Sequence, residues 1–239
     1  MVLGDRHGHP SSSHVFLTPV NYFGTLRMTK TFLPILKDQV IGGKAPYPPQ
    51  IVNIVSVAGM TSGGGGAASA YEASKHATEA FTNALRLEMK MFGIRVVAIN
   101  PSFHETPMAY GLTTRIQNQL LNKMTAEKKE EYGEGTSFGS EGAVQMDLLY
   151  SFFLIEFIEN YVRHVDRCIQ SGLWDLKVLI DSVVTVIRTK DPPAQVLVGM
   201  DRYFHASMTM LPQWARHFVI QLFIPPQTPS VLKSKKKNL

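Results

Sequence analysis

The sequence contains almost no cysteine. Cys168 is the single thiol among 239 residues, so no disulfide can form within the chain. A fold without disulfides is typical of a reducing compartment, and an intracellular location is therefore expected. This cysteine and the eight histidines form no cluster with metal-ligand spacing, so the sequence predicts no metal site.

Long hydrophobic runs are missing as well. The longest, LLYSFFLI at 148–155 and FVIQLFIPP at 218–226, fall well short of the roughly 18–20 residues of a membrane-spanning helix. Residues 1–14 lack the apolar stretch of a secretory signal and are interpreted as a flexible leader.

Positive charge gathers at the end of the chain, where four lysines lie within the last seven residues, KSKKKNL. The plain interpretation is a solvated tail, and no nucleic-acid partner is predicted. The alternative is a targeting signal, because Lys236 and Lys237 resemble a dilysine retrieval signal for the endoplasmic reticulum.

The apolar residues, 44% of the chain, follow the pattern of an α/β fold. Two short apolar runs, 51–56 and 94–101, are typical of strands buried on both faces. A helix expected over 70–92 separates them, and this crossover implies a parallel sheet. The other predicted elements are a helix over 16–37, loops over 41–50 and 59–69, a helix over 176–190 and a third strand over 194–201.

Tyr71 and Lys75 lie one helical turn apart in the run SAYEASKHATEAF. A tyrosine ordinarily ionises near pH 10, and an ammonium one turn away favours the phenolate and lowers that pKa. Such a pair suits proton transfer to a substrate oxygen, although a surface tyrosine beside a surface lysine gives the same spacing. Ser56 strengthens the chemical interpretation, because it follows the preceding strand at the sheet edge where ligands of α/β proteins bind.

Four motifs, in order, resemble the signatures of the short-chain dehydrogenase/reductase family. They are VNYFGTLRMTKTFLP at 20–34, NIVSVAG at 53–59, YEASK at 71–75 and INPSFHET at 99–106. A weaker match, DRYF…MTMLP within 201–212, is similar to the branch of D-β-hydroxybutyrate, retinol and 17β-hydroxysteroid dehydrogenases. The resemblance implies a Rossmann-like parallel sheet with flanking helices, a helical substrate lid, and NAD or NADP as the cofactor.

The resemblance also implies a role for each matching residue. Tyr71 is expected to act as general acid and base, while Lys75 lowers its pKa and binds the nicotinamide ribose. Ser56 is expected to orient the substrate carbonyl, and Asn21 to hold a water that links Lys75 to solvent. The residues expected at the nicotinamide end of the cofactor are Tyr71, Lys75, Pro101, Ser102 and Thr106.

The sequence departs from the family in three places. Ser102 stands where the family has glycine, and the loop before Tyr71 is longer, with four glycines at 63–66. The family's glycine-rich phosphate-binding turn and its Asn-Asn-Ala-Gly signature have no counterpart. The expected fold is therefore an N-terminally truncated domain with about three core strands, in which the strand at 51–56 has an open edge.

These features predict an NAD(P)-dependent oxidoreductase that interconverts a secondary or allylic alcohol and a carbonyl. A lipophilic retinoid, steroid or hydroxy-acid substrate is expected. The alternative is a non-catalytic relative that associates with a full-length family member. Pairing, with itself or with such a relative, is expected through helices 16–37 and 70–92. The apolar segment 146–158 suits a lid and also contact with an endoplasmic reticulum or mitochondrial membrane surface.

Three regions are predicted along the chain. The leader at 1–14 precedes a catalytic part at 15–203, which includes a helical lid or insert at 103–175. An apolar extension with the basic tail follows at 204–239. His76 and His104 flank site residues and are interpreted as hydrogen-bonded bystanders.

Overall fold

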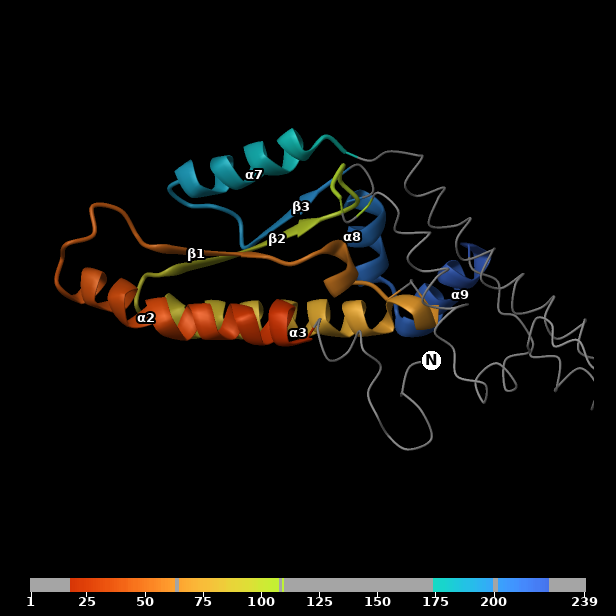
Figure 1. The fold of residues 1–239 in the computed structure, drawn as a ribbon, viewed down its shortest axis with the longest axis horizontal. Coiled ribbons are helices and arrows are strands. Elements are labelled where there is room, and N and C mark those ends of the chain that lie inside the picture. The colour runs from red at the N-terminus through yellow and green to blue at the C-terminus, as the bar shows by residue number, and fades with distance from the viewer. Residues whose placement is uncertain (1–17, 63–64, 108, 110–173, 200–201, 224–239) are drawn as a thin grey trace, which may run out of the picture. The chain divides into compact units, whose positions relative to one another are not determined.

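A computed structural model describes residues 18–62, 65–107, 109, 174–199 and 202–223 (Figure 1). The chain divides into two compact units, one of Met1–Glu105 with Trp174–Pro212 and one of Thr106–Leu173 with Gln213–Leu239. Most of the lid predicted at 103–175, and the tail beyond 223, lie outside the described residues. In the second unit, the structure describes helix α9, Gln213–Phe223, and a few residues from Thr106 onward.

The first unit is built on a sheet of three parallel strands. They are β1 (Gln50–Ile54), β2 (Arg95–Pro101) and β3 (Gln195–Val198), in the order β1-β2-β3. Gln50 of β1 pairs with Arg95, and β3 begins only opposite Ala98 of β2. The predicted parallel sheet is thus confirmed, and β2 is the strand with a neighbour on each side.

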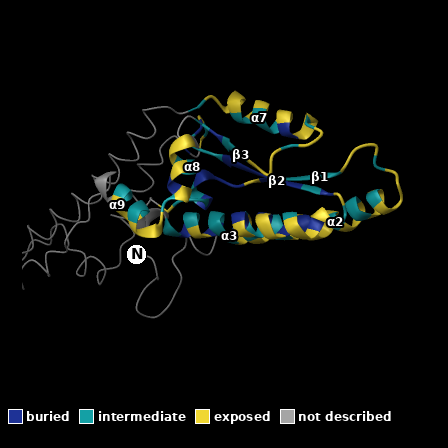
Figure 2. Ribbon diagram, turned by 180° about the vertical axis from the view of Figure 1, so that it is seen from behind, coloured by how far each residue is buried: buried dark blue, intermediate teal, exposed yellow. Residues whose placement is uncertain are grey.

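Helices cover both faces of this sheet (Figure 1). On one face lie α2 (Thr25–Ile41) and α3 (Gly65–Lys90), and on the other lies α7 (Leu176–Arg188). Val96 packs with Leu85 of α3, while the next residue, Val97, packs with Val186 of α7, because successive side chains of a strand point to opposite faces. Figure 2 shows the result, with β2 in dark blue between partly exposed helices.

Three short elements complete the unit. The segment before α2, η1 (Pro19–Gly24), is a π-helix, a wider turn that is frequent at functional sites. The 3₁₀ turn η2 (Val57–Gly59) follows β1, and helix α8 (Arg202–Met210) follows β3. A hydrogen bond of 2.8 Å between Thr61 Oγ1 and His205 Nδ1 links the loop after η2 to α8.

Helix boundaries differ from the prediction in two places. Helix α2 continues to Ile41, four residues beyond the predicted end at 37, so the following loop is shorter than expected. Helix α3 begins at Gly65, inside the loop predicted at 59–69. Glycine is tolerated there because it destabilises a helix mainly in the interior, whereas at the N-terminal end it costs only a few tenths of a kcal/mol, roughly, relative to the preferred capping residues.

Candidate active site

Ser56 lies just beyond β1, at the carboxyl edge of the sheet. It is 8% exposed and caps η2, because its Oγ accepts a hydrogen bond of 3.1 Å from the Ala58 N–H. The same hydroxyl lies 3.4 Å from the carbonyl oxygen of Pro101, at the end of β2. Ser56 is therefore held between the ends of two neighbouring strands.

The phenol of Tyr71, near the beginning of α3, lies close enough to the Ser56 side chain for that hydroxyl to act on its pKa. Burial raises the pKa of Tyr71 above its ordinary value, and the hydrogen bond with Ser56 lowers it by a smaller amount. This direction is opposite to the lowering expected from the sequence. The phenol is consequently protonated at neutral pH, which suits a proton donor.

Lys75 does not contact the phenol of Tyr71 directly. Its Nζ lies 5.8 Å from the centre of the Tyr71 ring and donates a long hydrogen bond of 3.4 Å to the Ile54 carbonyl. Burial lowers the pKa of this ammonium. An ammonium carries three N–H donors, so two of them are available for ligand oxygens at the strand ends.

Asn21, from η1, is joined to the same turn of α3. Its Nδ2 donates to Ser74 Oγ at 3.0 Å, and that hydroxyl donates to the Tyr71 carbonyl at 2.7 Å. The Asn21 carbonyl accepts from Thr78 Oγ1 at 3.1 Å. These bonds hold Asn21 against the residue before Lys75, and the predicted water relay to Lys75 stays a prediction.

Gly59 lets η2 approach α3 at the site. A Cβ added at Gly59 would lie 2.8 Å from the Lys75 carbonyl oxygen and 3.0 Å from a methyl carbon of Val55. No other residue type fits such a backbone approach without a shift. Gly59 therefore sets how close Ser56 and its turn can lie to Tyr71 and Lys75.

Beneath these residues lies a buried polar network that the sequence analysis missed. Asn100 is fully buried, and its Nδ2 donates to the Ser56 carbonyl at 3.0 Å and to Glu79 Oε2 at 2.9 Å. Glu79 is also buried, and its other oxygen accepts from Gln195 Nε2 at 3.1 Å. The signal was present, since Asn100 is a polar residue in an otherwise apolar strand run and Glu79 interrupts an alanine-rich helix.

The remaining predicted residues lie at the end of β2 and beyond. The Ser102 N–H donates to the Val198 carbonyl at 2.9 Å, which holds the segment after β2 beside β3. Thr106 belongs to the second unit, where its carbonyl accepts from the Ala109 N–H at 2.9 Å. The rings of His76 and His104 each lie 2.9 Å from a backbone carbonyl oxygen, of Glu72 and Ser102 respectively.

Comparison with known proteins finds a family that is similar to this part of the chain. A family model described as short chain dehydrogenase matches residues 15–117, a range that includes Asn21, Ser56, Tyr71 and Lys75. Retinol dehydrogenase 16 of Rattus norvegicus is 26% identical over 195 residues, which are 81% of this chain and 51% of that protein. Over these residues the chain is similar to the short-chain dehydrogenase family.

Other proteins similar to this chain come from the branch that the motifs indicated. Human (Homo sapiens) 17-beta-hydroxysteroid dehydrogenase type 2 is 34% identical over 122 residues, 48% of this chain and 28% of that protein. The chain spans about half the length of the retinol dehydrogenases that it matches, 51% and 54% for two of them.

Solved structures share the fold. A short chain dehydrogenase from Burkholderia cenocepacia in complex with NADP superimposes with a TM-score of 0.53 at 16% identity, over 92% of this chain and 63% of that one. A second, from Burkholderia phymatum in complex with NAD, gives 0.52 at 19% identity, over 95% and 65%. Across the described ranges, no helix is long and apolar enough to cross a membrane, and no three potential metal ligands cluster.

Proposed function

We propose that the chain carries the catalytic site of an NAD(P)-dependent oxidoreductase that interconverts a secondary or allylic alcohol and a carbonyl by hydride transfer. The observation that supports it most directly is the closeness of the Tyr71 phenol to the buried Ser56 hydroxyl, which acts on the pKa of the phenol at the carboxyl edge of the sheet. These two hydroxyls can both donate a hydrogen bond to one substrate carbonyl oxygen.

In this proposal Ser56 orients the carbonyl oxygen, and Tyr71 donates a proton from its Oη as negative charge develops on that oxygen. Retention of the phenol proton, which burial favours, matches the direction of carbonyl reduction. In the reverse direction Tyr71 would accept the alcohol proton, and the ammonium of Lys75, in the next turn of α3, would stabilise the phenolate.

The residues present fit the nicotinamide end of a dinucleotide. Lys75 has two N–H donors for ribose hydroxyls, and Ser102 and Pro101 lie at the end of β2 beside Ser56. NAD or NADP bound at this end would supply or accept the hydride. The sequence offers no glycine-rich turn for the pyrophosphate, so weak cofactor binding by this chain is expected.

A lipophilic substrate is part of this proposal, and the names of the relatives, which refer to retinol and to 17-beta-hydroxysteroids, support it. A retinoid, a steroid or a hydroxy acid would each offer the alcohol that the site requires. We include association with a membrane surface of the endoplasmic reticulum or mitochondria in this proposal, because lipophilic alcohols partition into bilayers.

The test is turnover of retinol and of a 17β-hydroxysteroid by the purified full chain with NAD and NADP. Tyr71→Phe should reduce kcat by about 10²- to 10⁴-fold, the usual contribution of a general acid. Tyr47→Phe is the matched control, because Tyr47 is 74% exposed in the loop before β1 and should leave kcat unchanged. Equal activity of Tyr71→Phe and wild type would refute the assigned role.

A second candidate is a non-catalytic protein that associates with a full-length relative. Helices α2 and α3 favour it, because they expose several large apolar side chains: Met28, Phe32, Ile35 and Leu87. Among the strands that the structure describes, β1 also has a neighbour on one side only. Under this candidate the chain binds no NADH at millimolar concentration, as judged by nicotinamide fluorescence, and migrates with the relative in size-exclusion chromatography. Cofactor binding by the chain alone would favour the enzyme.

A further inference from the structure

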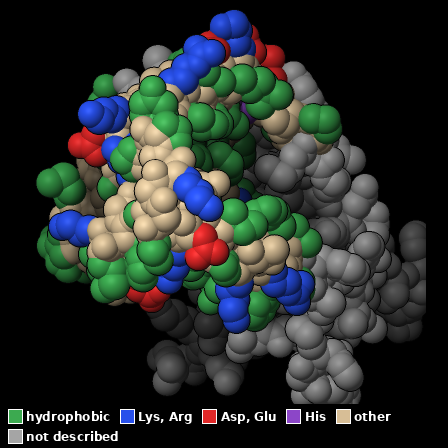
Figure 3. Space-filling view, turned by 90° about the vertical axis from the view of Figure 1, so that its left-hand side faces the viewer, with side chains coloured by type: hydrophobic (Ala, Val, Ile, Leu, Met, Phe, Trp, Pro, Cys, Tyr) green, Lys and Arg blue, Asp and Glu red, His purple; other side chains and the backbone are tan. Residues whose placement is uncertain are grey.

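Glu79 is a buried carboxylate that the proposed reaction does not use. It lies on α3, about two turns after Tyr71, and is 8% exposed. The charged side chains visible in Figure 3 project into solvent around apolar ones, which is the usual arrangement. Taking a carboxylate out of water is costly unless its oxygens are well paired, so the partners of Glu79 indicate what it holds in place.

Three neutral amides donate hydrogen bonds to this carboxylate. Asn100 Nδ2, from β2, donates to Oε2 at 2.9 Å. Gln195 Nε2, at the beginning of β3, donates to Oε1 at 3.1 Å. Asn83 Nδ2, in the next turn of α3, donates to the same oxygen at 3.3 Å. Glu79 therefore connects α3 to two neighbouring strands of the sheet.

Both strand residues also contact the turn that carries Ser56. The Asn100 Nδ2 donates its second hydrogen bond to the Ser56 carbonyl at 3.0 Å. The Gln195 Nε2 lies 3.5 Å from the sulfur of Met60, the residue that follows η2. The two ends of η2 are thus linked to Glu79, one through Asn100 and the other through Gln195.

An acceptor oxygen on Glu79 fixes the orientation of the Asn100 amide. The carboxylate and the Ser56 carbonyl are both acceptors, so both require the NH₂ group of Asn100. The Asn100 Oδ1 is left buried, with no hydrogen-bond partner in the part of the chain that the structure describes. Buried polar atoms are normally paired, so the two acceptors, and not the amide oxygen, determine how this amide is turned.

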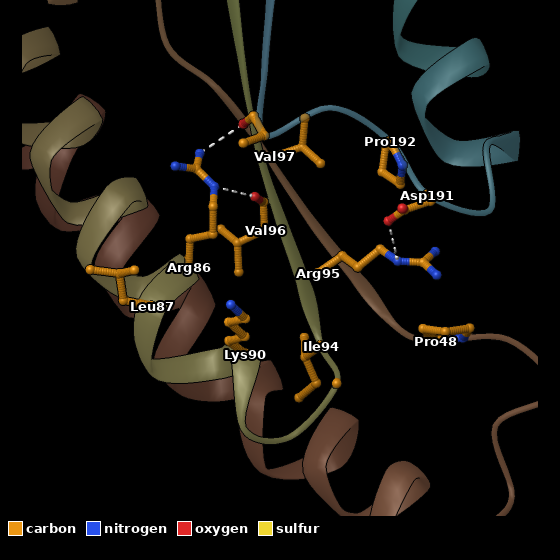
Figure 4. A pocket seen from close by; sticks show the side chains of 12 residues that line it. Pro48, Arg86, Leu87, Lys90, Ile94, Arg95, Val96, Val97, Asp191 and Pro192 are labelled. Carbon is orange, nitrogen blue, oxygen red and sulfur yellow. Dashed lines mark hydrogen bonds and ion pairs between the residues drawn. The ribbon is translucent and has the colours of Figure 1, made fainter.

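Glu79 is not required to hold α3 on the sheet. Two turns further along the helix, Arg86 Nε donates to the Val96 carbonyl at 2.8 Å, and Nη2 donates to the Ala194 carbonyl at 2.7 Å (Figure 4). Leu85 of the same helix packs in the core with Val96. Because α3 is anchored independently, the links from Glu79 to η2 point to a local role.

From these contacts we propose that Glu79 is a positioning residue for Ser56. Through the Asn100 amide it fixes the Ser56 carbonyl, and with it the direction of the Ser56 hydroxyl at the carboxyl edge of the sheet. The catalytic value of this placement rests on the proposed function, in which Ser56 orients a substrate carbonyl. A misplacement of about 1 Å at such a site is enough to slow a reaction by about 10²-fold.

Titration of Tyr71 tests the proposal without turnover. The Ser56 side chain lowers the pKa of the Tyr71 phenol, so a displaced Ser56 should raise that pKa. Glu79→Met keeps the length of the side chain but offers Asn100 no oxygen. Glu79→Gln is the matched control, because it loses the same charge but keeps one oxygen for Asn100. We expect phenolate absorbance to show a higher Tyr71 pKa in Glu79→Met than in Glu79→Gln.

The same comparison in a Ser56→Ala background completes the cycle. The two variants should then have equal Tyr71 pKa values, because the hydroxyl through which Glu79 acts is gone. Equal values with Ser56 present, or a difference that persists without it, would overturn the proposal. Should Glu79→Met fail to fold, Gln195→Met replaces it, at an exposed residue that carries the second link. The Tyr71 pKa should rise there too, and an unchanged pKa would overturn the proposal.

Kinetics extend the test to the proposed reaction. Glu79→Met should lower kcat by about 10- to 100-fold and change KM by less than about threefold, since the displaced hydroxyl matters most in the transition state. A normal kcat in this variant beside an active wild type would overturn the positioning role. An inactive wild type would instead refute the proposed function, and the titration would still decide the role of Glu79.

Discussion

Replacement of Asn100 by alanine tests the buried network that supports the candidate active site. Asn100 is fully buried and its amide donates two hydrogen bonds, one to the neutral Ser56 carbonyl and one to the Glu79 carboxylate. A neutral hydrogen bond contributes about 1 kcal/mol and one to a charged group about 1.5–3 kcal/mol. We therefore expect Asn100→Ala to lower the free energy of unfolding by about 3 kcal/mol, apart from the cavity that it leaves.

Asn53→Ala is the matched control. Asn53 lies in the neighbouring strand β1, is 8% exposed, and donates one neutral hydrogen bond, of 2.9 Å, to Thr82 Oγ1. The same atoms are removed and the cavity contribution is similar, so this variant should lose only about 1 kcal/mol of hydrogen bonding. The expected difference between the two variants is about 2 kcal/mol, which corresponds to a melting temperature lower by roughly 4–8 °C for a chain of this size.

The assay is urea unfolding at pH 7 followed by far-UV circular dichroism, with the melting temperature as a second measure. Equal destabilisation by Asn100→Ala and Asn53→Ala would refute the reasoning, because it would mean that the bond to Glu79 contributes nothing. A further comparison is Glu79→Gln, which keeps the shape but removes the charge. It should destabilise the wild type more than it destabilises Asn100→Ala, since the two residues are coupled.

The other predictions concern Tyr71 and Gly59. Phenolate absorbance at 295 nm, measured as the difference between wild type and Tyr71→Phe, should show that Tyr71 ionises above its ordinary pKa of about 10. Ser56→Ala should raise the pKa of Tyr71 further. A titration midpoint below pH 10 would contradict the burial argument. Because the folded pKa exceeds the unfolded one, the stability contributed by the neutral phenol is complete below about pH 10 and is lost as the pH rises through the folded pKa. Gly59→Ala should lower the free energy of unfolding, measured in urea, by about 1–3 kcal/mol, because its Cβ would lie 2.8 Å from the Lys75 carbonyl oxygen. Gly24→Ala, whose Cβ would make an ordinary contact of 3.6 Å, should be neutral or stabilising. Equal behaviour of the two glycine variants would show that the approach of η2 to α3 is not tight.

Much of the fold was predictable from the sequence because its strands are short, largely apolar runs, of which β2 is buried on both faces. The runs at 51–56 and 94–101 are mostly apolar, and the helix between them carries its small residues in one stripe, so the parallel crossover could be predicted directly. The beginning of α3 was not predictable, since the glycines at 63–66 indicated a loop, and local propensity does not reveal where packing against η2 begins.

The candidate site was predictable in its residues and not in its electrostatics. Sequence spacing places Tyr71 and Lys75 one turn apart, and it suggests that the ammonium lowers the pKa of the phenol. In the fold, burial dominates the pKa of Tyr71, and Lys75 is drawn to the Ile54 carbonyl. The Ile54 carbonyl belongs to β1, a segment distant in the sequence, and burial depends on the packed fold, so no local pattern could have contained either effect.

The π-helical segment Pro19–Gly24 has a consequence for the angular phase of the helix that follows. A π turn holds about one residue more than an α turn, and each residue of a helix turns the chain by about 100°. Asn21, within this segment, faces Ser74, while Leu33 and Leu36, after it, face the core. A straight α-helix of this sequence would present one of the two sets in the wrong direction. The extra residue thus lets the first turns direct Asn21 toward the candidate active site while the rest of the same helix directs its apolar side chains toward the core.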